Sequence, residues 1–235
     1  MGEVPDAVLA QLRECSTATL TTQLMRRGLR NTFLAGLRPL NPAKARFAGP
    51  AFTLRYIPSR EDIDVPEVFQ DRNHPQRVAI EATPPGHVLI MDSRQEPRAA
   101  SAGEILVTRL QQRGVAAVVT DGSFRDSPGI AATLDIPAFA AGMSAMTNLA
   151  LHHAVDMNVP IGCAGVPVYP GDIVVGDAEG VVVIPRHLAA EVAADALPQE
   201  RLEEFLRQRI ADGAPLFGTY PPDEQTLADY RSSNG

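Results

Sequence analysis

Residues 87–126 read HVLIMDSRQEPRAASAGEILVTRLQQRGVAAVVTDGSFRD, and this stretch decides the fold. Two short apolar runs, 87–91 and 115–119, predict buried strands. The residues between them predict a helix that begins at residue 101 or 102 and ends near 114. Strand, helix and strand in this order favour a right-handed crossover between two parallel strands.

The sequence on either side of this unit predicts a mixed architecture. Before it we expect helices over 5–14 and 17–27, a strand over 47–57, and a polar loop or insertion over 58–75. After it we expect a helix over 128–134, a strand over 137–141, and short strands near 159–162, 166–168, 172–175 and 180–184. Residues 186–212 predict two helices broken near Pro198, followed by a tail that lies on a neighbour or frays. We therefore expect one α/β domain over 1–235, a layered sandwich with N-terminal helices, a β-meander or barrel-like C-terminal half and a helical tail.

Composition and charge exclude several classes of partner. The net charge is −7, aromatic residues make up 5% of the chain, and tryptophan is absent. An acidic surface with few rings is a poor match for nucleic acid or an anionic membrane. The isolated Cys15 and Cys163 suit a reducing compartment, and we find no signal segment or apolar run long enough to span a bilayer. We expect a cytoplasmic protein.

The crossover unit predicts where a ligand would bind. Asp121-Gly122 indicates a turn directly after the second strand. The carboxyl ends of parallel strands meet at one edge of the sheet, and ligands bind in the crevice outside that edge. The start of the helix, near Gly103, and the loop 121–126 should therefore share one crevice.

The residues expected in this crevice predict a receptor for a small carboxylate. Gly103 has no side chain and allows a ligand to approach closely. The backbone N–H groups of Ile105 and Leu106, in the first turn of the helix, should point toward it. Arg125 can bind a carboxylate through two parallel hydrogen bonds.

The acidic residues beside them predict a metal. Glu104 and Asp126 offer hard oxygen ligands of the kind that Mg²⁺ or Mn²⁺ takes. A metal beside a bound 2-oxo acid polarises the keto oxygen and stabilises the enolate that forms when the adjacent carbon–carbon bond breaks. A Schiff-base mechanism is disfavoured because Lys44, which we expect to be exposed, is the only lysine.

Other polar residues are weaker candidates. His152-His153, if helical, point about 100° apart and are not expected to share an ion. Asp92 follows the first strand of the crossover and could support the crevice from behind. Gly142-Met143-Ser144 could line it. Asp172 and Asp177 are expected to fix turns through bonds to the backbone.

The chain resembles the RraA-like family, which groups the regulator of ribonuclease E activity with 4-hydroxy-4-methyl-2-oxoglutarate aldolases. The resemblance rests first on Gly103-Glu104, 20 intervening residues and Arg125-Asp126. Further matching segments are Gly49-Pro50-Ala51, Asp121-Gly122, Pro170-Gly171-Asp172, Gly176-Asp177 and 180–185. Together they cover roughly residues 17–195.

The resemblance implies an RraA-like sandwich assembled as a homotrimer or hexamer, with active sites at subunit interfaces. It implies that Arg125 holds the pyruvyl carboxylate with the amides of Ile105 and Leu106. It further implies that Asp126 ligates a divalent metal directly and that Glu104 acts through metal-bound water. The activity implied is cleavage of a 4-hydroxy-2-oxo acid to pyruvate, with decarboxylation of oxaloacetate.

The chain departs from the family at one position. Metal-binding members often carry a third acid three residues after the Arg-Asp aspartate, where this chain has Gly129. We therefore expect the metal to be held less tightly than in those members. Two other functions stay open: a protein-binding regulator of ribonuclease E, and a sugar-acid dehydratase or decarboxylase with the same enolate chemistry.

Overall fold

The computed structural model describes residues 4–233. Its α-helices are α1 (Asp6–Glu14), α2 (Thr17–Arg26), α3 (Pro75–Ala82), α4 (Glu104–Gln112), α5 (Ser127–Thr133), α6 (Ala189–Ala211) and α7 (Glu224–Ser233). Its strands are β1 (Arg38–Pro39), β2 (Phe47–Pro58), β3 (Val88–Asp92), β4 (Ala100–Ala102), β5 (Ala117–Phe124), β6 (Ala138–Met143), β7 (His152–Met157), β8 (Ile161–Cys163), β9 (Val166–Val168), β10 (Ile173–Gly176) and β11 (Val181–Ile184). Short 3₁₀ turns are η1 (Pro42–Lys44), η2 (Pro66–Gln70), η3 (Asn148–Ala150) and η4 (Arg186–Leu188).

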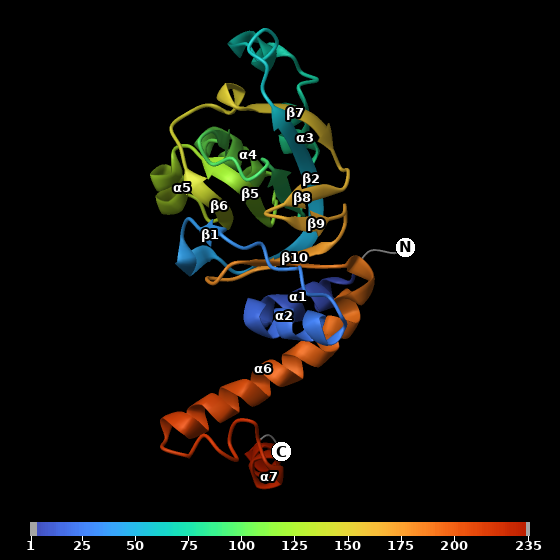
Figure 1. Ribbon diagram of the computed structural model, residues 1–235, viewed down its shortest axis with the longest axis vertical. Coiled ribbons are helices and arrows are strands. Elements are labelled where there is room, and N and C mark those ends of the chain that lie inside the picture. Colours follow the sequence, from blue (N-terminus) through green and yellow to red (C-terminus); the bar gives the residue numbers. More distant parts are fainter. Residues whose placement is uncertain (1–3, 234–235) are drawn as a thin grey trace.

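The main sheet has the strand order β1-β6-β5-β3-β2-β10-β11, with β4 added beside β5 and β7 beside β2. The central strands β2, β3, β5 and β6 are parallel to one another, as the sequence predicts for 87–91 and 115–119. The long strand β2 pairs with β10 through its first half and with β7 through its second half. The sheet therefore curls like part of a barrel, with the β8–β9 hairpin on its inner side (Figure 1).

Both faces of the central strands are covered, which explains their unbroken apolar sequences. Leu89 and Met91 of β3 pack with side chains of α3, α4 and α5. Val88 and Ile90, on the opposite face, pack with the β8–β9 hairpin. A third cluster joins β10 and β11 to α1, α2 and the first half of α6. The expected layered α/β architecture with a barrel-like half is confirmed.

The segment around Gly103 differs from the sequence prediction. Residues 100–102 do not begin the helix but form β4, which pairs with the end of β5. Three small residues carry too little periodicity to identify such a strand from the sequence. Gly103 then has the extended backbone of an N-cap, and α4 begins at Glu104.

The prediction of a turn at Asp121-Gly122 is also wrong. Both residues lie inside β5, which runs on to Phe124. The buried Asp121 carboxylate accepts hydrogen bonds from the N–H groups of Ser93, Gln95 and Ala164. Burial raises the pKa of Asp121. A β-carbon on Gly122 would stand 2.8 Å from Ser93 Cβ, so this Asp-Gly pair serves close packing of loops onto the strand.

The C-terminal part holds one further correction. The helix α6 continues through Pro198 without a break. Its first half is anchored on α1 and α2 by buried Val192, Ala193 and Ala196, which stabilises a helix that the proline alone would weaken. The tail, which was expected to lie on a neighbour or to fray, forms the helix α7 and packs on α6 through Phe205 and Tyr230, with ring centroids 5.3 Å apart. Figure 1 shows α6 extending away from the sheet toward α7.

The sequence between β2 and β3 contains η2, inside the polar stretch 58–75, and the helix α3, which begins at the last residue of that stretch, Pro75. His152 and His153 belong to β7 rather than to a helix. Neighbouring residues of a strand point to opposite faces, so we still do not expect His152 and His153 to bind the same ion. Across residues 4–233, none of the helices has the length and apolarity to span a bilayer.

Candidate functional site

The two distant segments predicted to share a crevice meet beside β4. The backbone N–H of Arg125 donates to the Ala102 carbonyl over 3.0 Å, which fixes the end of β5 against the start of α4. A β-carbon on Gly103 would lie 2.8 Å from Arg125 Cγ and 3.1 Å from Asp126 Oδ2. Because Gly103 has no side chain, the side chains of Arg125 and Asp126 have room to lie beside the N-terminus of α4.

A cavity of about 300 Å³ opens at this point. Five of its lining residues were predicted from the sequence: Gly103, Ile105, Leu106, Arg125 and Asp126. Ala100 and Ala102 of β4 also line it. Such a volume is at the small end of ligand pockets and suits a small organic acid.

Arg125 and Asp126 are both half-exposed and lie next to each other, with Nε and Oδ2 3.7 Å apart. Asp126 has a left-handed backbone, φ 58°, which a residue other than glycine seldom adopts. It is the N-cap residue of α5, yet its side chain does not cap that helix. The carboxylate is therefore directed toward Gly103 and Arg125, where it can bind a ligand.

Glu104 reaches the same region from the first turn of α4, but it turns toward α5. A β-carbon on Gly129 would lie 2.5 Å from Glu104 Oε2. Glu104 Oε1 also lies 3.2 Å from the Thr133 hydroxyl, whose shorter hydrogen bond, 2.8 Å, is to the Gly129 carbonyl. Glu104 does not line the cavity itself, whereas Asp126 does.

The donor set fits a weakly held hard cation. In residues 4–233 no three His, Cys, Asp or Glu side chains gather closely enough to enclose a metal. One half-exposed carboxylate, Asp126, with a second acid nearby is the set through which Mg²⁺ binds while keeping several waters. The residues thus fit Mg²⁺ or Mn²⁺ and do not fit a tightly enclosed ion such as structural zinc.

The two predicted backbone donors differ. The Leu106 N–H donates to the Gly103 carbonyl over 3.1 Å within the first turn. Within residues 4–233 the Ile105 N–H has no backbone acceptor, and Gly103 offers no side chain to cap it. The Ile105 amide is therefore the better placed of the two to bind a carboxylate.

Seven lining residues were not predicted from the sequence: Ala100 and Ala102 of β4, and five residues from other segments. Phe69, Gln76 and Arg77 come from the segment between β2 and β3, and Thr147 and Asn148 come from the segment before β7. These residues belong to no recognisable sequence motif. They reach the cavity only through tertiary packing of α3 and η3 against β4 and β7.

The weaker candidates have mainly structural roles. Asp92 accepts hydrogen bonds from the N–H groups of Arg94 and Gly162 and is absent from the cavity lining. Asp172 and Asp177 accept hydrogen bonds from backbone N–H groups in their turns, as predicted. Gly142 and Met143 line a different hollow of about 350 Å³.

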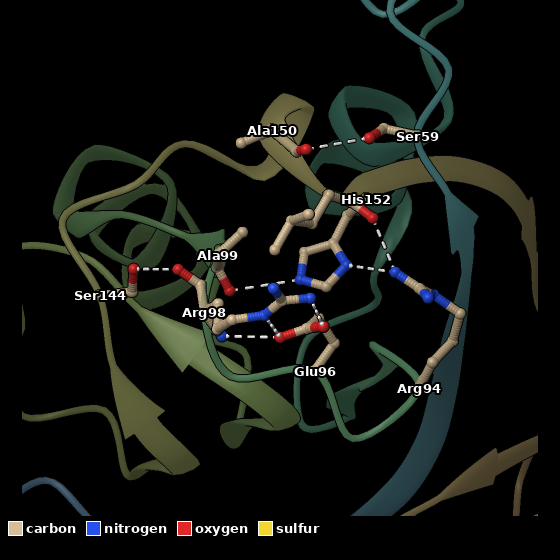
Figure 2. A network of polar contacts seen from close by, with 9 residues as sticks. Ser59, Arg94, Glu96, Arg98, Ala99, Ser144, Ala150 and His152 are labelled. Carbon is tan, nitrogen blue, oxygen red and sulfur yellow. Dashed lines mark hydrogen bonds and ion pairs between the residues drawn. The ribbon is translucent and has the colours of Figure 1, made fainter.

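His152 is buried in a network that joins two loops near β4 (Figure 2). Its Nε2 lies 3.2 Å from the Ala99 carbonyl and its Nδ1 lies 3.3 Å from Arg94 Nη2. Because Arg94 can only donate, His152 accepts at Nδ1 and donates from Nε2. Arg94 also donates to the Leu151 carbonyl. Burial lowers the pKa of His152, so we assign it a structural role as a neutral side chain.

A hollow larger than the cavity beside Gly103 lies elsewhere. It measures about 910 Å³ and is bordered by α2, α6 and residues 220–231. Two of its lining charges, Arg27 and Asp195, pair with each other, and Arg27 also pairs with Glu191.

The family match and two similar proteins indicate the same family for this chain. Residues 17–183 match the family described as RraA-like, Aldolase/RraA. A protein of Halalkalibacterium halodurans named as a candidate 4-hydroxy-4-methyl-2-oxoglutarate aldolase is 29% identical over 223 residues, covering 94% of this chain and 96% of its own. A protein of Burkholderia mallei with the same name is 32% identical over 139 residues, covering 59% and 74%.

Among solved structures, RraAS2 of Streptomyces coelicolor is similar, with a TM-score of 0.78 and 29% identity. The match covers 89% of this chain and 100% of that one. That protein is described as an unusual member of the RNase ES inhibitor RraA family. The family match spans well over half of the chain and agrees with the fold, the Gly103-Glu104 segment and the Arg125-Asp126 pair. The protein belongs to the RraA-like family.

Proposed function

We propose that this protein is a divalent-metal-dependent lyase, of the class II type, which cleaves a 4-hydroxy-2-oxo acid to pyruvate and decarboxylates oxaloacetate. The observation that carries the proposal is the adjacency of Arg125 and Asp126, 3.7 Å apart at a small cavity beside Gly103. One side chain can bind a carboxylate and the other a cation within the length of a 2-oxo acid. The candidate aldolase names of two relatives support the same reaction class.

In this proposal each residue has one task. Arg125 binds the carboxylate beside the keto group through two parallel hydrogen bonds, and the Ile105 N–H contributes a third. Asp126 would hold Mg²⁺ or Mn²⁺ directly, and Glu104, set back against α5, would act through water. Such an ion, when bound, supplies the Lewis acidity that polarises the keto oxygen and stabilises the charge released by carbon–carbon cleavage.

The position of Lys44 supports metal rather than imine chemistry. Lys44 is only partly exposed, which corrects the expectation from the sequence. Its Nζ donates to the Leu134 carbonyl over 2.8 Å and pairs with Asp135 at 3.0 Å. Lys44 does not line the cavity, and it is the only lysine of the chain. A covalent Schiff base with the substrate therefore has no amine to form it.

The direct test is pyruvate release from oxaloacetate and from a 4-hydroxy-2-oxo acid, with and without Mg²⁺ or Mn²⁺. We expect release that depends on the metal, stops with a chelator and is strongly reduced in Arg125→Ala. Release of a different product from sugar-derived acids, without pyruvate, would indicate a dehydratase or decarboxylase instead. Absence of metal-dependent turnover of 2-oxo acids would contradict the proposal.

We also propose a homotrimer or hexamer with the site at a subunit interface. Ile105 is 83% exposed although it lines the cavity, and Met143 and Met146 are also exposed. Large apolar side chains exposed near a binding site are typical of a surface that a partner covers. Mass measurement in solution, compared with an Ile105→Glu variant, tests this: we expect the wild-type oligomer to dissociate in the variant.

A second candidate function is regulation of a ribonuclease through protein contact. The specific observation is the similarity to RraAS2, which is described as a member of the RNase ES inhibitor family. The net charge of −7 suits docking on a basic surface. Capture of a ribonuclease E scaffold region by this protein, retained in Arg125→Ala, would support it, and absence of binding would contradict it.

A further inference from the structure

Residues 60–74, between β2 and α3, contribute to one wall of the cavity beside Gly103. Figure 1 shows this segment as a loop that projects from the body at the top of the view. Phe69 of this segment lines the cavity, and the guanidinium carbon of Arg77 in α3 lies 4.5 Å from the centroid of the Phe69 ring. Phe69 and Arg77 also border a second hollow, so this stacked pair separates the two spaces.

The segment is weakly tied to the rest of the protein. Within residues 4–233, one hydrogen bond joins a side chain of this segment to another element: His153 Nδ1 of β7 donates to the Asp64 carboxylate over 2.6 Å. The Asp64 side chain is buried, and its other oxygen accepts from the Arg60 N–H over 2.7 Å. A segment held by so few contacts can open and close without unfolding the sheet.

His74, at the end of the segment, is the buried group that supports Phe69. It is 8% exposed, and its ring packs edge-on against the Phe69 ring with the centroids 5.4 Å apart. Its Nδ1 is buried and makes no hydrogen bond. A neutral ring tolerates this environment, but a protonated ring would place a charged N–H donor there without an acceptor. The contact with Phe69 is therefore favoured only while His74 is neutral.

The charged groups around His74 do not compensate for a proton on its ring. Arg77 of α3 and His153 of β7 disfavour the proton, whereas Asp64 and Asp71 of the segment favour it. Asp64 is already hydrogen-bonded to His153, and Asp71 is exposed to solvent. Burial, with Arg77 and His153, outweighs the two acids and lowers the pKa of His74.

We propose that residues 60–74 are a pH-sensitive lid on the cavity: when His74 takes up a proton, its ring leaves Phe69 and the wall formed by Phe69 and Arg77 opens. Above about pH 6.5 the ring is neutral in both the closed and the open lid, so its contribution to closure is complete. Below that value the open lid binds a proton that the closed lid excludes. Closure then weakens by up to about tenfold per pH unit until the lower pKa of the closed state is reached. The effect on ligands rests on the proposed function, in which this cavity holds a 2-oxo acid.

Hydrogen exchange tests the lid without any ligand. The probes are the hydrogen-bonded amides of Asp64, Val68 and His74, with each rate expressed as protection relative to an unstructured peptide at the same pH. Between pH 7.5 and pH 5.5 we expect protection in wild type to fall about 5- to 10-fold. In His74→Gln and in His74→Leu, which cannot take up the proton, it should change by less than about twofold. His187→Gln, at an exposed histidine of η4, should behave as wild type. Thermal unfolding at both pH values shows that each variant is folded.

Calorimetry with pyruvate and Mg²⁺, at the same two pH values, tests the link between lid and cavity. Wild type should lose about 5- to 10-fold more affinity on acidification than His74→Gln. Constant protection in wild type, or an equal fall in the His74 variants, overturns the lid. A pH-dependent lid without pyruvate binding at either pH supports the lid and contradicts the proposed function. Pyruvate binding with the same pH dependence in both proteins supports the binding site and contradicts control by the lid.

Discussion

The carboxylate of Glu104 lies over the α-carbon of Gly129, where a β-carbon would stand 2.5 Å from Oε2 and 2.9 Å from Cδ. The resemblance to the RraA-like family implies that metal-binding members often carry a third acid at the position of Gly129. In this chain the space for that side chain is taken by Glu104, which also lies within hydrogen-bonding distance of Thr133. Glu104 can therefore take this orientation only because residue 129 has no side chain.

Gly129→Ala should separate stability from activity. The β-carbon meets the end of a flexible side chain, which can swing away, so the fold is expected to tolerate the change. Alanine is favoured over glycine inside a helix by about 1 kcal/mol, and the unfolding midpoint should stay or rise. The metal-dependent rate should fall about 10-fold because Glu104 is displaced. Ala132→Ser on the exposed face of α5 is the control, and an unchanged rate in Gly129→Ala would show that this orientation of Glu104 is not needed.

Gly103→Ala should weaken substrate binding without unfolding the protein. Gly103 has φ −122° and ψ 178°, a backbone that any residue adopts, so the cost arises from the contact and not from the backbone. The new methyl group would meet Arg125 Cγ at 2.8 Å and displace the guanidinium group. We expect KM to rise about 10-fold or more in steady-state kinetics. Gly162→Ala, where no atom lies within 4 Å of the new carbon, should leave KM unchanged.

His152 should make the protein sensitive to acid. Its pKa is lowered by burial, so the folded state favours the neutral ring. Above about pH 6.5 the ring is neutral in both states and its contribution is complete. As the pH falls below that value the unfolded chain takes up a proton that the folded protein does not, and stability decreases until the folded pKa is reached.

The measurement is the free energy of unfolding in urea between pH 7 and pH 5. In this interval the slope of the free energy against pH should be smaller in His152→Gln than in wild type, by up to about 1.4 kcal/mol per pH unit. His87→Gln, a change at a less buried histidine, controls for the loss of one imidazole ring. Identical slopes in His152→Gln and wild type would contradict the structural role of the neutral ring.

Much of the site could be predicted from the sequence because its two halves belong to one local unit. The apolar runs of β3 and β5 identify parallel strands, and parallel strands bring Gly103 and Arg125 to the same edge. The prediction did not depend on details that were wrong. Asp121-Gly122 lies inside β5 rather than in a turn, and the strand still delivers Arg125 to the start of α4.

The other wall of the cavity could not be predicted, for physical reasons. Arg77 and Asn148 are separated from Arg125 by tens of residues and reach it only through the packing of α3 and η3. Their local sequences carry no periodicity or motif specific to binding. Likewise Pro198 is a helix breaker by local rules, and α6 persists because its first half is fixed by tertiary contacts. The structure at these positions depends on contacts between residues that are distant in sequence, and local sequence patterns do not reveal those contacts.

The central claim is that Arg125 binds the carboxylate of a 2-oxo acid in a metal-dependent lyase. The most direct measurement is the rate of pyruvate formation from oxaloacetate with Mn²⁺, above the metal-only background, for wild type, Arg125→Ala and the exposed-surface control Arg72→Gln. We predict that kcat/KM falls about 100-fold or more in Arg125→Ala, the loss of a bidentate charged contact, and is unchanged in Arg72→Gln. Pyruvate formation by wild type that equals the metal-only background, or that is unaffected in Arg125→Ala, would contradict the claim.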